Sequence, residues 1–287
     1  MIVAARGAQI GAAWRQASQR IDRLDARLLL EYVCACTHAD LIGHPEREMT
    51  TAQSAKFDAL LSRREAGEPL AYLLGSAYFC GLEFAVSPAV LIPRPDTEVL
   101  VDQAIRIVKA WCQERAAPRI VDLGTGSGIV AIMLARLCLS AAITAVDVSA
   151  AALDVARANA ERHRAQILFL EGDWFAPLGG EWFDLIVSNP PYVADGDPHL
   201  QQNGLPFEPQ SALTDGVAGG DGLACIRTII AGAQSHLLPG GWMIIEHGYD
   251  QAVKVTQILR AAGFEDVASW RDSAAIVRVS GGRQPNY

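Results

Sequence analysis

The spacing of apolar residues divides the 287-residue chain into a helical first part and a second part of alternating strands and helices. In residues 21–36, apolar side chains recur every three or four positions, which predicts a helix with one buried face. The residues that form this stripe are Leu24, Leu28, Leu29 and Tyr32. A second helix is predicted with Thr51 as its N-cap and Gly67 as its C-cap. We therefore expect residues 1–75 to form a small helical domain.

The hydrophobic period changes in residues 76–95, where aromatic and aliphatic residues flank Gly81 and predict a short β-hairpin. Two prolines stiffen the end of this stretch. We expect it to link the helical domain to a second domain at 96–280, followed by a flexible tail at 281–287.

The second domain is predicted to alternate between strands and helices. Strands are predicted at 119–124, 142–148, 166–173, 183–191, 240–248, 264–270 and 274–280, and helices at 98–111, 129–138, 149–163 and 251–263. This alternation is typical of a mostly parallel α/β sheet covered by helices on both faces. Ligands of such sheets bind at the carboxyl ends of the strands.

Composition narrows the possible functions. The chain is 51% hydrophobic, which excludes a mostly disordered protein. With 24 basic and 32 acidic residues, the net charge of the chain is −8. This charge argues against a protein whose main function is to bind nucleic acid or anionic lipid. The six cysteines form no CxxC pair, and we expect them to be reduced. The chain shows no signal peptide and no apolar run of membrane-spanning length, so we expect a cytoplasmic protein without a membrane partner.

The first motif with chemical character is the sequence VDLGTGSG at residues 121–128, between a predicted strand and helix. Its glycines allow a ligand to approach the backbone closely. The dinucleotide pattern GxGxxG needs a glycine where this chain has Ile129, which disfavours an NAD-linked oxidoreductase. Asp147 ends the next strand, where a carboxylate can accept hydrogen bonds from ribose hydroxyls. These features predict a nucleotide-like cofactor.

The second motif is Asn189-Pro190-Pro191-Tyr192, directly after an apolar strand. Pro191 has no N–H, so the Pro190 carbonyl is free to point into a cleft beside the side-chain oxygen of Asn189. Two converging acceptors suit a planar NH2 group, and the Tyr192 ring can pack on the flat face of that group.

Together with Gly172-Asp173-Trp174, these motifs resemble those of S-adenosylmethionine-dependent methyltransferases that methylate exocyclic or amide nitrogen. More narrowly, the chain resembles the PrmC (HemK) family, the glutamine-N5 methyltransferases of peptide-chain release factors. Further segments that carry this resemblance are EPLAYLLG at 68–75, LIPRPDTE at 91–98, FEP at 207–209 and DGL at 221–223. The chain departs from the family at Cys80, where an aromatic residue is more common, and has small residues at Thr125 and Ser127.

The resemblance implies a Rossmann-like, seven-stranded class I methyltransferase sheet, with the N-terminal helical domain joined by the β-hairpin. It implies S-adenosyl-L-methionine as cofactor and the glutamine of the GGQ motif in class I release factors as substrate. The residues implied at the methionine part of the cofactor are Gly124, Thr125, Gly126, Ser127 and Gly128. Asp147 is implied at the ribose, and Asp173 and Trp174 at the adenine.

The resemblance also implies that Asn189, Pro190 and Tyr192 are catalytic and, with Pro191, contact the substrate, while Asn189 also touches the cofactor. Residues that could close the cofactor pocket are Arg94, Thr97 and Glu98. The sequence contains no convincing general base, and Glu246 and His247, at the end of a predicted strand, are no more than candidates. We expect no metal, because the sulfonium loses its own charge as the methyl leaves.

The helical domain is expected to recognise the substrate protein, and residues 193–221 are expected to form a substrate-facing loop. We expect a monomer that makes no direct contact with nucleic acid. The alternatives are a ribosomal-protein glutamine methyltransferase, a DNA adenine-N6 methyltransferase, which the acidic charge disfavours, and a non-catalytic binding module.

Overall fold

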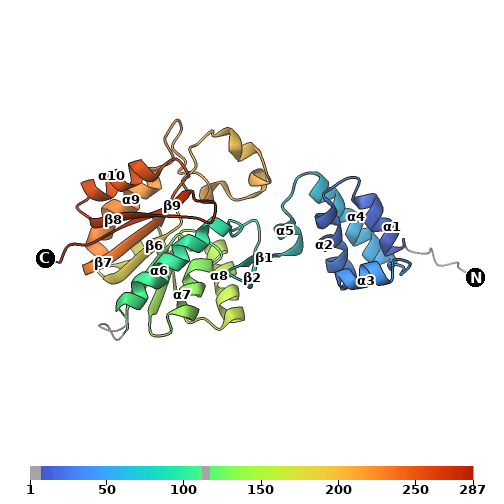
Figure 1. Cartoon of the computed structure of the whole chain (residues 1–287), viewed down its shortest axis with the longest axis horizontal. Helices are drawn as coiled ribbons and strands as arrows, with labels where there is room; N and C mark the ends of the chain where they lie inside the picture. The colour runs from blue at the N-terminus through green and yellow to red at the C-terminus, as the bar shows by residue number, and fades with distance from the viewer. Residues whose placement is uncertain (1–7, 112–116, 287) are drawn as a thin grey trace, which may run out of the picture. The chain divides into compact units, whose positions relative to one another are not determined.

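A computed structural model describes residues 8–111 and 117–286. Cys112 and the N-terminal residues considered above for a signal peptide lie outside the described residues. The chain divides into two compact units: one contains the chain up to Gly75 together with Gln201–Phe207, and the other contains Ser76–Leu200 and the chain from Glu208 onward. Figure 1 shows the helices and strands of each unit.

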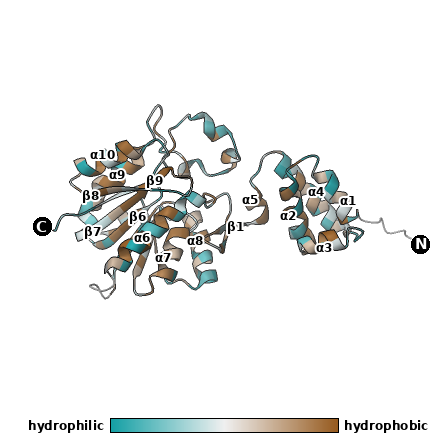
Figure 2. Cartoon of the chain, in the orientation of Figure 1, coloured by the Kyte–Doolittle hydropathy of each residue, from teal (hydrophilic) through white to brown (hydrophobic). Residues whose placement is uncertain are grey.

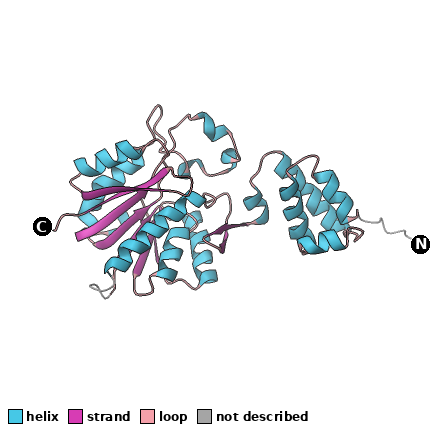
Figure 3. Ribbon diagram, in the orientation of Figure 1, coloured by secondary structure: helices cyan, strands magenta, loops and turns pink. Residues whose placement is uncertain are grey.

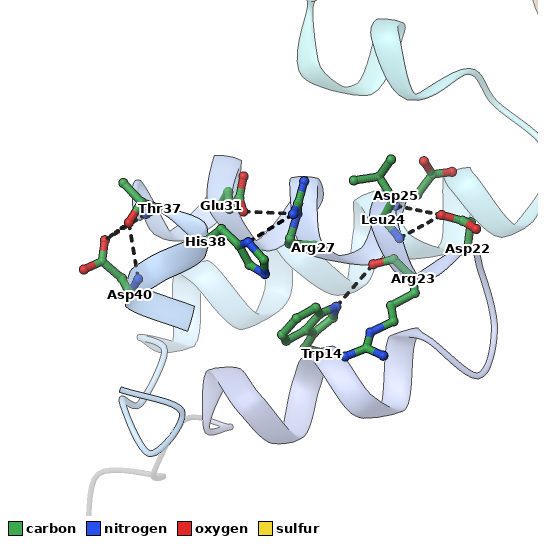
Figure 4. Close-up of polar contacts among 10 residues, drawn as sticks. All are labelled: Trp14, Asp22, Arg23, Leu24, Asp25, Arg27, Glu31, Thr37, His38 and Asp40. Atoms are coloured by element: carbon green, nitrogen blue, oxygen red, sulfur yellow. Dashed lines mark hydrogen bonds and ion pairs between the residues drawn. The ribbon is translucent and has the colours of Figure 1, made fainter. Parts of the chain in front are cut away.

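The first unit is helical. Its helices are α1 (Ile10–Ala17), α2 (Arg23–Cys34), α3 (His38–Gly43), α4 (Thr51–Glu65) and α5 (Leu70–Leu74). They enclose one apolar core, to which Ile10, Leu30 and Phe57 contribute buried side chains. Side chains cap the N-termini of two of these helices (Figure 4). Asp22 accepts hydrogen bonds from the backbone at the start of α2, and Thr37 and Asp40 form a capping box at the start of α3.

The predicted buried stripe of α2 is correct at Leu29 and wrong at two of its other positions. Leu24 is 51% exposed and Tyr32 is 45% exposed, whereas the helix buries Ala26, Leu29, Leu30, Val33 and Cys34. The run of three leucines at 28–30 is compatible with more than one helical face, and packing against the other helices selects the face. The N-cap of α4 is Thr50, one residue before the predicted Thr51.

The second unit begins with the predicted hairpin, formed by β1 (Ser76–Phe79) and the antiparallel β2 (Leu82–Ala85). Both turn residues, Cys80 and Gly81, have positive φ, which is the geometry of a tight two-residue hairpin turn. The hairpin prediction is confirmed.

The main sheet of this unit has seven strands in the order β5-β4-β3-β6-β7-β9-β8 (Figures 1 and 3). Its strands are β3 (Arg119–Leu123), β4 (Ala142–Asp147), β5 (Leu168–Glu171), β6 (Phe183–Ser188), β7 (Leu237–Glu246), β8 (Glu265–Arg271) and β9 (Val277–Arg283). The first five strands in spatial order are parallel, and β9 pairs antiparallel with both β7 and β8. This arrangement confirms the predicted class I methyltransferase sheet.

Helices pack on both faces of the sheet. They are α6 (Glu98–Trp111), α7 (Ile129–Leu137), α8 (Ala150–His163), α9 (Ala224–Ala233) and α10 (Ala252–Ala261). One apolar cluster joins α6, α7 and α8 to the sheet, and a second joins α9 and α10 to its other face. Figure 2 shows hydrophobic residues along the strands and on the helices beside them. Helix α9 was not among the predicted elements.

The expected tail at 281–287 differs in the structure, since Gly281 and Gly282 belong to β9. A Cβ atom on Gly281 would lie 2.5 Å from the Met243 carbonyl oxygen and 2.6 Å from Ile244 Cγ2. The glycines therefore allow the strand to continue at a point too crowded for a side chain.

The described cysteines at 34, 36, 80 and 225 are free thiols. No helix within residues 8–111 and 117–286 is both long and apolar enough to cross a bilayer. In the same part of the chain, no group of His, Cys, Asp and Glu side chains is arranged to hold a metal ion.

Candidate active site

The glycine motif forms the turn between β3 and α7. Gly124, Gly126 and Gly128 have φ angles of +72°, +55° and +83°, a region that L side chains rarely adopt. Gly128 caps α7, and a Cβ atom there would lie 3.1 Å from both the Ala156 Cβ and the Ile132 Cδ1. The motif thus combines a left-handed backbone with close packing of α7 against α8.

Asp122, near the end of β3, stabilises this turn through hydrogen bonds. Its buried carboxylate accepts hydrogen bonds from the Thr125 hydroxyl at 2.7 Å and from the Ala131 N–H at 3.2 Å. Burial raises the pKa of Asp122 to about 7, because the charged form loses its hydration. These hydrogen bonds connect Thr125 in the turn and Ala131 at the start of α7 to the same carboxylate.

Asp147, at the end of β4, also holds the turn. Its Oδ2 accepts a hydrogen bond from the Gly126 N–H at 2.8 Å, and its Oδ1 accepts one from the Ser149 N–H at 2.9 Å. A carboxylate oxygen can accept more than one hydrogen bond, so this half-buried group can still receive ribose hydroxyls.

A cavity of about 520 Å³ lies at the carboxyl ends of the parallel strands. The sequence-predicted residues that line it are Gly124, Gly126, Asp147, Asp173, Trp174 and Pro191. The Trp174 ring lies beside Gly124, where an added Cβ would be 3.3 Å from it, and Trp174 itself has a φ of +43°. Part of the remaining lining comes from Pro209–Ala212 and Asp215, which belong to the loop expected to face the substrate, and from Cys225, which the sequence reasoning missed.

A smaller cavity of about 40 Å³ shares Gly124 and Gly126 with the first. Predicted residues that line it are Thr125, Ser127, Arg94, Thr97 and Asn189. Gly128, Pro190 and Tyr192 line neither cavity. Glu98 is also absent from both linings, and its carboxylate accepts a hydrogen bond from the Cys80 N–H of the hairpin at 3.2 Å.

Asn189 stands at the carboxyl end of β6 and its side-chain amide is oriented by a neighbour. Its Nδ2 donates a hydrogen bond to the Thr97 hydroxyl oxygen at 3.1 Å. Thr97 is buried, so this acceptor is held in place. Among the described residues none donates a hydrogen bond to Asn189 Oδ1, which leaves the oxygen for a ligand.

Tyr192 is fixed at both its hydroxyl and its backbone. The hydroxyl donates to Glu246 Oε1 at 3.2 Å, and the backbone carbonyl accepts from Gln251 Nε2 at 2.9 Å. Burial and the nearby Glu246 raise the pKa of the phenol, so it stays neutral. The ring therefore acts as an apolar surface with a fixed orientation.

The two candidates for a general base lie behind this motif. Burial raises the pKa of Glu246 to about 7 and lowers the pKa of His247. His247 Nε2 contacts the Ser280 hydroxyl at 2.8 Å and its Nδ1 contacts the Gly248 carbonyl at 2.9 Å. Neither candidate lines either cavity. Both ring nitrogens of His247 are therefore already engaged by neighbouring groups of the protein.

Comparison with known proteins identifies the family. The profile of the PrmC N-terminal domain matches residues 9–75, and that of the methyltransferase small domain matches residues 97–203. The release factor glutamine methyltransferase of Bordetella pertussis is 50% identical over 263 residues, which cover 91% of this chain and 95% of that protein. This chain belongs to the release factor glutamine methyltransferase family. The family member from Burkholderia pseudomallei is 48% identical over 272 residues, or 92% of this chain and 93% of that protein.

Two solved structures share the fold at low identity. The human Mettl16 catalytic domain in complex with the MAT2A 3'UTR hairpin 1 has a TM-score of 0.55 and 16% identity, covering 90% of this chain and 91% of that one. The T. thermophilus 16S rRNA N2 G1207 methyltransferase (RsmC), in complex with AdoMet and guanosine, has a TM-score of 0.52 and 19% identity, covering 73% and 49%. Both support the class I methyltransferase fold.

Two of the sequence segments that resemble the release factor glutamine methyltransferase family make specific contacts near the site. In FEP at 207–209, the buried Glu208 pairs with the Arg94 guanidinium and accepts the Ile92 N–H at 2.9 Å. This joins the connector after the hairpin to the loop that lines the large cavity. In DGL at 221–223, a Cβ on Gly222 would lie 2.3 Å from the Tyr192 carbonyl oxygen, so the backbone passes directly against the NPPY motif.

Proposed function

We propose that this protein transfers a methyl group from S-adenosylmethionine to the side-chain amide nitrogen of the GGQ glutamine in class I peptide-chain release factors. The observation that carries the proposal is the orientation of Asn189. Its NH2 group is bound to Thr97, so its oxygen remains for a substrate amide beside the cofactor cavity.

The two cavities fit the parts of S-adenosylmethionine. Asp147 suits the ribose, because its carboxylate accepts hydroxyl hydrogen bonds at the end of β4. Asp173 and Trp174 suit the adenine, as a hydrogen-bond acceptor and an aromatic wall. The turn at Gly124–Ser127 suits the methionine part, where backbone must be approached closely. When bound, the cofactor supplies an activated methyl group on a sulfonium.

The protein's own residues then position the nucleophile. An amide nitrogen is a poor nucleophile because its lone pair is delocalised into the carbonyl. Asn189 Oδ1 and the Pro190 carbonyl accept hydrogen bonds from the two amide N–H groups, which orients the nitrogen and stabilises the positive charge that develops on it. After methyl transfer the nitrogen loses one of its hydrogens to water as a proton. The neutral Tyr192 ring packs on the flat face of the amide, and its bond to Glu246 fixes the ring position.

The substrate protein is proposed from the relatives. The curated proteins that match nearly the whole chain carry the name release factor glutamine methyltransferase, which favours release factors over ribosomal proteins or DNA. The helical unit contributes the surface for recognising the substrate protein, because a short glycine-flanked loop offers little area for binding by itself. The protein acts as a monomer in the cytoplasm, without direct contact to nucleic acid or membrane.

The Asn189→Ala variant tests the catalytic role. Loss of one positioned group at a reacting centre commonly lowers kcat by about 10²–10³. We expect this loss when labelled S-adenosylmethionine is incubated with a release factor, while the variant stays folded with modestly reduced cofactor affinity. The exposed Gln166→Ala before β5 serves as the matched amide control.

Parallel reactions with a ribosomal protein and with DNA identify the substrate class. Label transferred to the release factor alone supports the proposal. Label found mainly in the ribosomal protein or in DNA contradicts it. Unchanged turnover by Asn189→Ala on the release factor removes Asn189 from the catalytic role.

A further inference from the structure

Glu246 is a fully buried carboxyl group that the reaction described above does not use directly. It is the last residue of β7 and has no exposed surface. Its Oε1 accepts the Tyr192 hydroxyl at 3.2 Å, and the hydroxyl of the buried Thr97 lowers the pKa of the carboxyl group by stabilising its charged form. Glu246 Oε2 has no hydrogen-bond partner among the described residues. Such a group is costly to bury, which suggests a role beyond packing.

We propose that Glu246 is a positioning residue that fixes the direction of the hydrogen bonds behind the NPPY motif, so that Asn189 presents its oxygen to the substrate. The inference rests on the proposed function, since the orientation of Asn189 matters only if that oxygen receives the substrate amide. Glu246 reaches both Tyr192 and, through Thr97, Asn189.

The direction of the hydrogen bonds that Thr97 makes with Glu246 and Asn189 follows from the number of hydrogens on each group. The Thr97 hydroxyl has one hydrogen and two acceptor sites. When that hydrogen is donated to Glu246, the Thr97 oxygen can only accept from Asn189, and the group that donates is the NH2 end of the amide. The Asn189 oxygen must then point away from Thr97. Loss of the acceptor at Glu246 would remove this constraint.

Charges around Glu246 are compatible with an acceptor. Arg278 lowers the pKa of Glu246 and Asp96 raises it, while burial is the largest cause of its rise to about 7. Arg278 also pairs with Asp96 at 2.9 Å and with Asp272 at 3.3 Å, so its charge is shared. A proton placed on the unpartnered Oε2 leaves Oε1 to accept from Tyr192. The Tyr192 bond therefore keeps its direction when the carboxyl group is neutral.

Glu246 acts through its neighbours rather than on the substrate. It lines neither the large cavity nor the small one, and Thr97 and Asn189 stand at the lining of the small one. Removal of a proton from the substrate by Glu246 is therefore not part of the proposal.

The Glu246→Leu variant keeps about the size of the side chain and removes both acceptor oxygens, whereas Glu246→Gln keeps one acceptor oxygen in the place of Oε1. Without an acceptor at position 246, the Thr97 hydroxyl is free to donate to the Asn189 oxygen, so the orientation of the amide is no longer fixed. We expect kcat on the release factor to fall about 10–100-fold in Glu246→Leu, the range for groups that orient a functional residue, and to change little in Glu246→Gln. Binding of S-adenosylhomocysteine, measured by calorimetry, should change less than about two-fold, because Glu246 is not in the cavity lining.

Two further variants separate positioning from structure. Thr97→Val removes the connecting hydroxyl and should lower kcat to a similar degree, and the double variant should be no worse than either single one, because both break the same chain. Glu246→Asp retains two acceptor oxygens and should recover part of the lost kcat. Glu161→Gln, on an exposed part of α8, is the control for loss of a charge.

The outcomes are distinguishable. A full kcat for Glu246→Leu, or additive losses in the double variant, overturns the inference. Parallel losses of cofactor affinity and melting temperature also overturn it, because they indicate a merely structural role. A wild-type protein that transfers no methyl group to the release factor contradicts the proposed function itself, independently of Glu246.

Discussion

At the scale of single residues, the site consists of polar groups whose orientation is already fixed by hydrogen bonds to neighbouring residues. Asp147 is held by the Gly126 and Ser149 N–H groups, and Asn189 is held by Thr97. Each keeps an acceptor for a ligand. Because these groups are already oriented, little conformational entropy is lost when a ligand binds.

The Asp147→Ala variant is predicted to bind S-adenosylhomocysteine about 10–100-fold more weakly. Hydrogen bonds to charged groups contribute roughly 1.5–3 kcal/mol, and the variant also leaves the Gly126 N–H without its acceptor. Calorimetry measures the change, with Asp154→Ala, at an exposed site on α8, as the control. Tight NAD binding by the wild type, without any response to S-adenosylhomocysteine, would contradict the predicted cofactor.

At the scale of elements, one buried side chain joins the hairpin to the glycine turn. Asn159, in the middle of α8, donates to the Ala85 and Ser127 carbonyls at 3.0 and 2.9 Å and accepts from the Ala85 N–H at 2.7 Å. All its polar atoms are thus engaged. The helix therefore fixes β2 and the turn relative to each other within the catalytic unit.

The Asn159→Ala variant is predicted to lower the free energy of unfolding by about 3 kcal/mol, because buried backbone groups lose their partners. Chemical denaturation followed by circular dichroism measures the loss. Glu161→Ala, exposed on the same helix, should change stability by less than about 0.5 kcal/mol. Equal stabilities of the two variants would show that the Asn159 bonds contribute little.

At the scale of the whole molecule, the cofactor cavity and the helical unit are built from separate parts of the chain. The residues that line the large cavity and those that line the small cavity all belong to the unit that contains Ser76–Leu200 and the chain from Glu208. The helical unit also includes Gln201–Phe207, whose Gly204 packs closely against Pro69. The long loop therefore contributes to both units.

A chain that starts at Ser76 is predicted to keep S-adenosylhomocysteine binding and to lose most of its kcat/KM on a whole release factor. The cavity lining is complete without residues 1–75, whereas the proposed recognition surface is removed. Calorimetry and methyl transfer with the release factor measure the two properties. Equal kcat/KM for the truncated and full-length proteins would exclude a recognition role for the helical domain.

The sequence by itself determined the order of most strands and helices, the hairpin and the two motifs, because periodicity and turn chemistry are local properties. It also pointed to the family and its fold. It did not determine the buried face of α2, where three consecutive leucines fit several faces, or the existence of α9.

Only the tertiary structure decided the partners of the site residues. Thr97 and Asn189 are 92 residues apart, Tyr192 and Glu246 are 54 apart, and Arg94 and Glu208 are 114 apart. No local pattern links such positions, and a polar residue does not specify its partner by its own type. The sheet brings them together because packing of the apolar strands and helices fixes which strand ends lie side by side, and hydrogen bonds then form between the groups that meet there.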